Sequence, residues 1–166
     1  ILLASAVAAG NSVLGNIIGP QKNGTSNVTS NTQSDGISIN SSPNNTIGGS
    51  AVGARNIISA NLERGIYING ATATGNLIKG NYIGLDQNGT TFITSSTQDY
   101  GVYVTASAAS NTIGGTVSDE GNVISGNTSS GVYTNSTAAA GNSVFGNIIG
   151  PQANVTSNVT SNAQFY

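Results

Sequence analysis

The sequence predicts an all-β fold, a right-handed parallel β-helix of about five coils with three short strands in each coil. The first observation behind this prediction is a long internal repeat. GNSVLGNIIGPQ at 10–21 returns as GNSVFGNIIGPQ at 141–152, and NTIGG occurs at 45–49 and at 111–115. A fixed period of this kind is typical of stacked units, because one unit alone cannot bury its apolar side.

The second observation is a shorter unit inside the long repeat. A glycine followed by alternating β-branched residues begins at Gly36, Gly65, Gly101 and Gly131. Ile1 takes the place of Val132 when the chain is shifted onto its last repeat, so residues 1–35 form one more unit. The sequence therefore predicts one domain over 1–166, made of the coils 1–35, 36–64, 65–100, 101–130 and 131–166.

Each coil contains three short apolar stretches, which in the third coil are 66–68, 77–78 and 82–83. They are too short and too often interrupted by glycine for helices, and β-branched residues favour strands. Strands stacked in register lie about 4.8 Å apart. Like residues are then expected above one another in inward columns. These columns are Ile18, Ile58, Ile83, Ile124 and Ile149; Val13, Ile47, Ile78, Ile113 and Val144; and Ile39, Ile68 and Val104.

Asparagines recur just before two of the strands in every coil. Asparagine tolerates left-handed backbone, bonds to backbone groups at turns, and can form side-chain ladders between stacked strands. We therefore expect two structural asparagine ladders rather than a row of ligand-binding residues. The ladders are Asn11, Asn45, Asn76, Asn111 and Asn142, and Asn16, Asn56, Asn81, Asn122 and Asn147.

The coils differ in where they carry extra residues. Coils 1, 3 and 5 have a tight link between the second and third strands and then a long loop, at 20–35, 85–100 and 151–166. Coils 2 and 4 instead insert six residues into that link, which makes bulges at 48–55 and 114–121. The long loops are expected on one side of the molecule, two rungs apart, where ligand contacts on repeat proteins usually arise.

The composition argues against several classes of function. Charged residues are 6% of the chain, the net charge is −2, and His, Cys, Met and Trp are absent. We therefore expect no nucleic-acid partner, and with no apolar run of the ~20 residues a span needs, no membrane insertion. Clustered acid–base groups are also missing, so no enzyme activity, catalytic residue or cofactor is predicted.

Metal binding is not predicted either, because the sequence has no Cys or His for zinc and no GGxGxD calcium repeat. Asp86–Gly89 resembles the start of a calcium loop but lacks the later glutamate, which favours a plain turn. Asp119 and Glu120 are expected to face Arg55 across the bulges as a solvated surface contact. Sequons in the long loops of coils 1 and 5 are possible glycosylation sites, at Asn23, Asn27, Asn154 and Asn158.

The N-x-I-x-G-N-x-I-G unit, the G-[IV]-x-[IV] starts and NTIGG together resemble bacterial right-handed β-helix repeat proteins of the pectate-lyase-like superfamily. The resemblance covers essentially the whole chain and is closest to modules of surface or secreted proteins. It implies a stalk-like or adhesin-like role at the cell surface or outside the cell.

We expect a structural subunit or segment of an extracellular filament, stalk or surface coat that assembles by end-to-end stacking of coils. Its partner is then another copy in a head-to-tail homopolymer, or flanking repeats of the same chain. The alternatives are an adhesin that binds surface glycans through the long loops, and a carbohydrate-active enzyme whose site lies outside this segment. An outward apolar stripe is expected to pack against a neighbouring protofilament or under a loop. It consists of Ile17, Ile57, Tyr82, Val123 and Ile148.

Overall fold

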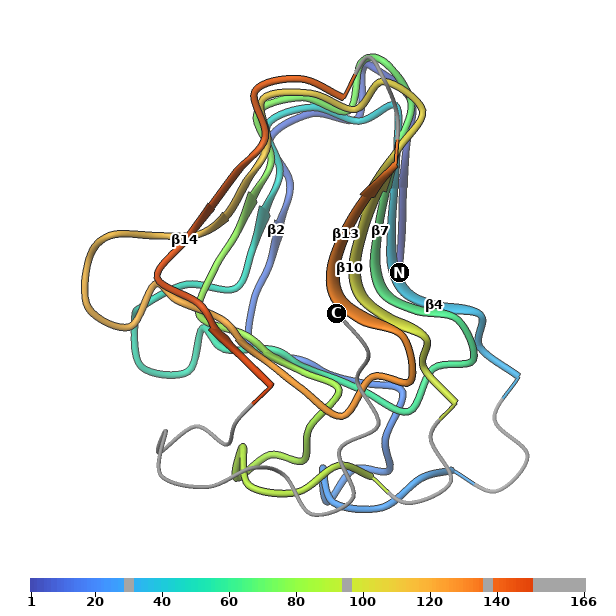
Figure 1. Cartoon of the computed structure of the whole chain (residues 1–166), viewed down its shortest axis with the longest axis vertical. Helices are drawn as coiled ribbons and strands as arrows, with labels where there is room; N and C mark the ends of the chain where they lie inside the picture. The colour runs from blue at the N-terminus through green and yellow to red at the C-terminus, as the bar shows by residue number, and fades with distance from the viewer. Residues whose placement is uncertain (29–31, 94–96, 136–138, 151–166) are drawn as a thin grey trace.

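The computed structural model describes residues 1–28, 32–93, 97–135 and 139–150. Over these residues the chain winds as a right-handed parallel β-helix whose coils stack along one axis (Figure 1). No helix is present in the described part of the chain. The prediction of an all-β solenoid with about five coils is confirmed.

Strands of the described residues form three parallel sheets of five strands, and each coil gives one strand to each sheet. The first sheet contains the longest strands, β1 (Leu2–Ala4), β4 (Asp35–Asn40), β7 (Arg64–Asn69), β10 (Tyr100–Thr105) and β13 (Ser130–Asn135). The second contains β2 (Ser12–Val13), β5 (Thr46–Ile47), β8 (Leu77–Ile78), β11 (Thr112–Gly114) and β14 (Ser143–Phe145). The third contains β3 (Ile17–Ile18), β6 (Ile57–Ile58), β9 (Tyr82–Ile83), β12 (Val123–Ile124) and β15 (Ile148–Ile149).

The strand register places like residues above one another, as the repeat predicts. Ile47 pairs with Val13 on one side and Ile78 on the other, and Ile58 pairs with Ile18 and Ile83. In the first sheet Ile68 lies between Ile39 and Val104. All three predicted columns are therefore confirmed.

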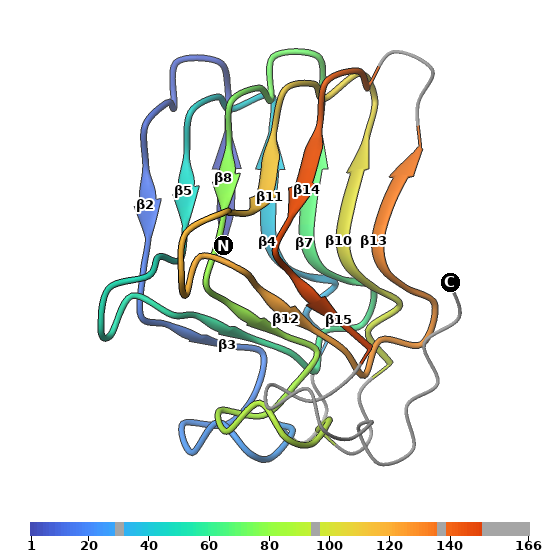
Figure 2. The same ribbon diagram turned by 60° about the vertical axis from the view of Figure 1, so that its left-hand side comes forward.

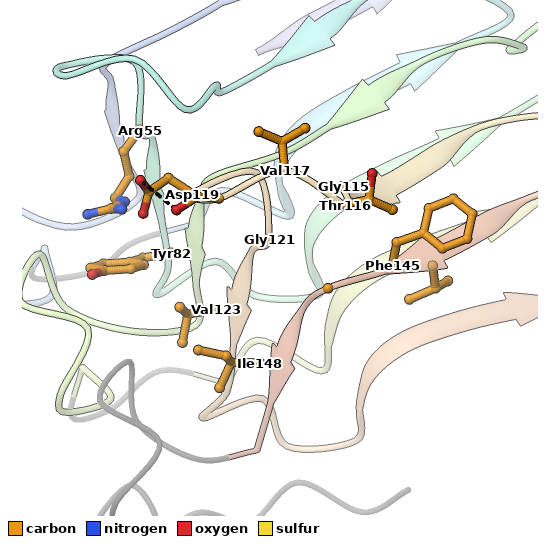
Figure 3. Close-up of a pocket in the computed structure, with 13 residues that line it drawn as sticks. Arg55, Tyr82, Gly115, Thr116, Val117, Asp119, Gly121, Val123, Phe145 and Ile148 are labelled. Atoms are coloured by element: carbon orange, nitrogen blue, oxygen red, sulfur yellow. Dashed lines mark hydrogen bonds between the residues drawn. The ribbon is translucent and has the colours of Figure 1, made fainter.

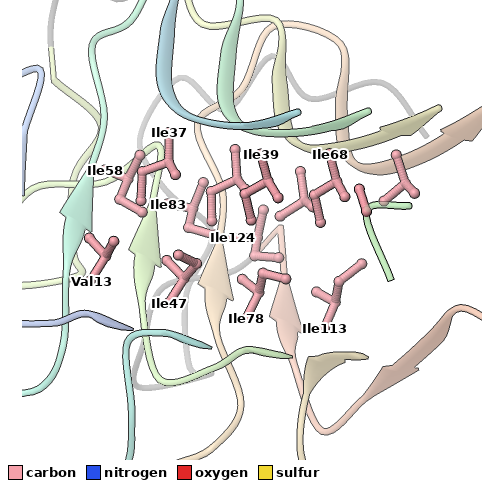
Figure 4. Packing of buried hydrophobic residues seen from close by; sticks show 14 of the residues in the cluster. Val13, Ile37, Ile39, Ile47, Ile58, Ile68, Ile78, Ile83, Ile113 and Ile124 are labelled. Carbon is pink, nitrogen blue, oxygen red and sulfur yellow. The ribbon is translucent and has the colours of Figure 1, made fainter. Parts of the chain in front are cut away.

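The core is a set of isoleucine and valine columns that fill the inside of the coil (Figure 4). The column side chains of the middle coils are fully buried, among them Ile47, Ile78 and Ile124. A further inward column of the first sheet, Ile37, Ile66 and Val102, was not among the predicted ones. At ~25 cal/mol per Å² of apolar surface removed from water, such columns are the main stabilising contribution.

The extra residues lie on two different parts of the wall (Figures 1 and 2). The bulges of coils 2 and 4 project beside the second and third sheets, whereas the long loops of coils 1 and 3 lie together beyond the third sheet. The two long loops touch, because the amide of Gln87 donates to the carbonyl of Gly24 at 2.9 Å. Loops two rungs apart are thus in direct contact. Residues 151–166, the third predicted long loop, lie outside the described residues.

The outward stripe on the third sheet is covered in its central part. Leu85 and Phe92 of the coil 3 loop pack against Tyr82, Val123 and Ile148. Ile57 is also buried, whereas Ile17 in the first coil is 40% exposed. Of the two predicted uses of this stripe, packing under a loop is the one the described residues adopt.

The described residues include no helix with the length and hydrophobicity needed to cross a bilayer.

Candidate functional site

The first predicted asparagine ladder runs through all five coils. In each step the backbone amide and the side-chain amide of one asparagine both donate to the side-chain oxygen of the next. Asn45 reaches Asn76 Oδ1 at 2.9 Å with both groups, and Asn76 reaches Asn111 Oδ1 at 3.0 and 2.8 Å. The same pattern joins Asn11 to Asn45 and Asn111 to Asn142.

The second predicted ladder has the same geometry beside the third sheet. Asn56 donates to Asn81 Oδ1 at 3.2 and 2.9 Å, and Asn81 donates to Asn122 Oδ1 at 3.0 and 2.9 Å. Asn16 and Asn147 complete it at the two ends. The three middle members are fully buried. Buried amides must be hydrogen-bonded to avoid a desolvation cost, and the neighbouring coil supplies the partner here.

A third amide ladder precedes the first sheet and was not predicted. Gln33 donates to Asn61 at 2.7 Å, Asn61 donates to Gln98 at 2.8 Å, and Gln98 donates to Asn127 at 2.8 Å. Glutamine and asparagine alternate, which hides the column from a search for identical residues. The signal is positional: each glutamine stands three residues before the glycine that opens the next coil, and each asparagine stands four before it. The longer glutamine side chain compensates for that offset.

Two of the ladders have a direction that is the same in every coil. The backbone amide of each asparagine points toward the following coil, and its side-chain oxygen receives bonds from the preceding coil. The first coil therefore presents oxygen acceptors at its open face, and the last described coil presents backbone donors. The two ends of the stack are chemically complementary rather than alike.

The apolar columns of the second and third sheets reach the surface at the last described coil. Val144 is 45% and Ile149 41% exposed there, whereas their counterparts in the first coil, Val13 and Ile18, are each 7% exposed. The equivalent residues Ile113 and Ile124, one coil inward, are fully buried. An open rung also exposes unpaired strand edges, which favour pairing with another chain or coil.

Tyrosines form a column on the outer face of the first sheet. Tyr67, Tyr103 and Tyr133 stand in register, with ring centroids 5.6 and 5.1 Å apart, and Tyr100 stacks on Tyr133 at 5.3 Å. The guanidinium of Arg64 lies 4.1 Å from the centre of the Tyr67 ring. Cross-strand aromatic pairs and a cation over a ring each add to sheet stability.

Two carboxylates surround that arginine. Arg64 Nε lies 2.8 Å from Asp35 Oδ1, and Arg64 also contacts the Glu63 carboxylate. Burial raises the pKa of Asp35 above its ordinary value of 3.8, although the charge of Arg64 acts in the opposite direction. The nearby negative charge of Glu63 raises the pKa further.

A groove of about 780 Å³ lies between the coil 4 bulge and the wall behind it (Figure 3). Arg55, Tyr82 and Asp119 line one end, where the guanidinium of Arg55 lies 4.2 Å from the centre of the Tyr82 ring. Val123 and Phe145 provide apolar lining. Arg55 Nε also donates to the backbone carbonyl of Gly80 at 3.1 Å, so one of the hydrogen bonds of this guanidinium joins it to the neighbouring coil.

The expected contact of the Asp119–Glu120 pair with Arg55 is only partly confirmed. Asp119 shares the groove with Arg55, but Glu120 forms its ion pair with Lys79 of coil 3 at 2.7 Å. Hydrogen bonding from Lys79 lowers the pKa of Glu120 below 4.5. The sequence offered no way to decide which base the bulge would reach, because both lie within two coils of it.

The remaining sites predicted from sequence are turn residues in the structure. Asp86 accepts the backbone amides of Thr90 and Thr91 at 3.0 and 3.3 Å, which is the predicted turn. Among the residues that the structure describes, no cluster of three acidic, histidine or cysteine side chains could hold a metal.

Two of the four sequon asparagines lie in the described part of the chain. Asn23 is exposed, and its side-chain oxygen accepts the amides of Thr25 and Ser26. Asn27 is half-buried at the bridge with Pro20. Asn154 and Asn158 fall outside the described residues.

Comparison of the chain with family models, with curated proteins and with solved structures finds no match.

Proposed function

We propose that this chain is a structural segment of a longer β-solenoid, such as an extracellular fibre, stalk or surface coat, in which further coils stack on its ends. The observation that carries this proposal is the continuity of three amide ladders and several apolar columns along one axis. Every buried polar group in those ladders bonds to the coil above or below, so each coil is a template for the next. Repeat proteins of this kind gain stability by adding units.

The chemistry of the side chains supports a structural role over catalysis. Asparagine and glutamine amides do not titrate and are not nucleophiles, and they are committed to one another at 2.7–3.2 Å. The carboxylates with shifted pKa values, Asp35 and Glu120, each face a single base at different places on the surface. A general acid and base would have to share one site.

Localisation outside the cell or on its surface is part of the same proposal. It rests on the resemblance of the repeat motifs to bacterial surface and secreted β-helix proteins. We also propose, from the same motifs alone, that the chain belongs to the pectate-lyase-like superfamily.

The test is an internal duplication that lengthens the stack without altering either end. A second copy of 36–100 is inserted after Tyr100, and Ala6 and Ala106, exposed residues of equivalent turns, are replaced by cysteine for spin labels. At ~4.8 Å per coil, one and two duplications should separate these positions by about 24 and 34 Å. Pulsed dipolar spectroscopy measures the distance, and narrow distributions are expected because the coils are rigidly stacked.

A collapsed or broad distance distribution, or loss of β structure after duplication, would contradict the role as an extendable spacer. The matched control duplicates 36–64 alone. It puts a short-loop coil directly on another one and disturbs the alternation of coil types, so it should be less stable than the two-coil duplication.

Glycan binding is a second candidate, favoured by the tyrosine column of the first sheet rather than by the long loops. Aromatic rings with a polar edge suit ligands that have both apolar and polar faces, as sugars do. Retention of the chain on a glycan array, lost in Tyr103→Ala and kept in Tyr82→Ala, would support it. No retention of the unmodified chain would leave the structural role as the better explanation.

A further inference from the structure

The groove beside the coil 4 bulge has two ends of different chemistry. Figure 3 shows Arg55 and Asp119 together at one end, whereas Phe145 lies at the other. Val123 and Ile148 contribute further apolar lining. The volume of about 780 Å³ is within the range of small-molecule sites, ~300–1,000 Å³. The groove is therefore large enough for a small ligand that is charged at one end and apolar at the other.

The guanidinium of Arg55 is held in place by two contacts with the wall. It lies 4.2 Å from the centre of the Tyr82 ring, and its Nε donates to the Gly80 carbonyl at 3.1 Å. Among the residues that the structure describes, no acceptor is bonded to its two Nη atoms. Two parallel Nη–H groups match the two oxygens of a carboxylate. Because the wall already fixes the guanidinium, a carboxylate can bind there at little cost in side-chain order.

The negative charge at the same end of the groove belongs to Asp119. Its carboxylate accepts a hydrogen bond from Ser118 Oγ at 3.3 Å, and it forms no ion pair with Arg55 or another base within 1–28, 32–93, 97–135 and 139–150. The neighbouring acid, Glu120, is already paired with Lys79. A ligand that is only an anion would be repelled by Asp119, and one that is only a cation would be repelled by Arg55. The two charges therefore favour a ligand that carries both signs.

The position of the apolar lining narrows the class of ligand. Phe145 is 45% exposed, so its ring is available for contact at the end away from the charges. A fatty acid has no cationic group, and a peptide has its terminal charges at opposite ends. An α-amino acid carries the carboxylate and the ammonium group on one carbon, and its side chain extends away from both. This arrangement matches the groove.

We propose that the groove binds a free α-amino acid with a large apolar side chain. Arg55 binds the carboxylate, Asp119 binds the ammonium group, and the apolar side chain lies against Val123 and Phe145. The site goes beyond the structural role of the chain. Its lining residues lie on the outside of the wall, and none of them belongs to an amide ladder or to an inward column of the middle coils.

The test uses the 166-residue chain and three ligands that share an indole ring. Tryptophan carries both charges, tryptamine lacks the carboxylate, and indole-3-propionic acid lacks the ammonium group. Titrations followed by NMR measure the three dissociation constants, with the backbone amides of Val123 and Ile148 as reporters. We expect tryptophan to bind about tenfold more tightly than either analogue, because a hydrogen bond to a charged group contributes on this scale.

Two substitutions assign each charge of the ligand to its partner. Arg55→Gln should weaken the binding of tryptophan and of indole-3-propionic acid roughly tenfold, and should not weaken that of tryptamine. Asp119→Asn should weaken the binding of tryptophan and of tryptamine, and should not weaken that of indole-3-propionic acid. The matched control is Lys22→Gln, which removes an exposed positive charge from the coil 1 loop and should leave all of these affinities unchanged.

Arg55 and Asp119 are both exposed, so their variants should keep the fold, and the comparison of ligands on the unmodified chain needs no variant. Equal affinity for the three ligands, or no shift of the reporter amides with tryptophan, would overturn the proposal. An effect of Lys22→Gln equal to that of Arg55→Gln would also overturn it, because binding would then depend only on net charge. The distances expected in the duplicated chain do not depend on this groove, so the two proposals fail independently.

Discussion

An asparagine in the middle of a ladder carries more hydrogen bonds than an asparagine in the end rung. Asn81 Oδ1 accepts two bonds from Asn56, and its side-chain amide donates to Asn122 Oδ1 and to the carbonyls of Ile47 and Lys79. Asn16 donates to Asn56 but belongs to the first coil, which has no coil before it in the described structure. Asparagines at different positions in one ladder therefore contribute differently to the stability of the fold.

We predict that Asn81→Ala lowers the free energy of unfolding by about 2–4 kcal/mol, because buried donors of Asn56 lose their acceptor at ~1–3 kcal/mol each. Asn16→Ala should cost about 1 kcal/mol, since its surroundings are half-exposed. Urea unfolding followed by circular dichroism measures both. Similar costs for the two substitutions would show that the ladder stabilises each rung locally and does not depend on neighbouring coils.

Glycine serves two purposes in this fold: it adopts left-handed backbone, and it lets the next coil approach closely. Gly53 and Gly84 separate the two. Gly53 and Gly84 have nearly the same left-handed φ, +82° and +83°. A Cβ on Gly53 would meet nothing within 4 Å, whereas a Cβ on Gly84 would lie 2.0 Å from the Ser125 carbonyl of the next coil.

Gly53→Ala should therefore cost only the backbone penalty of about 1–2 kcal/mol. Gly84→Ala should cost clearly more than that, because the two coils must separate to admit the methyl group. Thermal unfolding of the two variants gives the comparison. Equal unfolding midpoints would mean that the coils can move apart at the third sheet at little cost in stability.

At the scale of the strand, β4 and β7 are joined at one end by Asp35 and Arg64. The raised pKa of Asp35 means that the folded protein holds a proton that the unfolded chain releases above pH 3.8. In that window the free energy of unfolding falls as pH rises. Glu120 has the opposite effect on this pH dependence. Because its pKa is lowered in the folded protein, the free energy of unfolding rises with pH just below 4.5.

We predict that Asp35→Asn makes the dependence of unfolding free energy on pH more positive just above pH 3.8. Glu120→Gln should make it more negative just below pH 4.5. Urea titrations between pH 3 and 6 measure both slopes. A change of the same sign in the two variants would contradict the assigned pKa directions.

The elements differ in how far the sequence determines them. Strands and columns follow from the repeat, because Ile47 and Ile58 have aliphatic counterparts at fixed intervals in every coil. The Gln33–Asn127 ladder was missed because its members change type and shift by one residue. The pairing of Glu120 with Lys79, and the cover that Phe92 gives to Val123, depend on where bulges and loops fold back. Periodicity carries no information on those directions.

At the scale of the whole molecule, the coils form a one-dimensional stack whose sheets join neighbouring coils, while the long loops of coils 1 and 3 also touch across two rungs. The described strands pair only with the rung before or after them. Stability should then vary along the axis, with the open end rungs opening more often than the middle. A globular domain of the same size with a single closed core would not show this gradient.

Hydrogen exchange can test the gradient with chemically matched amides. Leu77, Thr112 and Ser143 each donate to the carbonyl of the ladder asparagine one coil earlier, at 2.8, 2.9 and 2.8 Å. Because their hydrogen bonds are alike, any difference in protection reports on coil position. We expect Ser143, in the last described coil, to exchange at least tenfold faster than Leu77, with Thr112 between them. Identical protection at all three would mean that the coils open only together, and a strictly nearest-neighbour stack would then be the wrong description of this molecule.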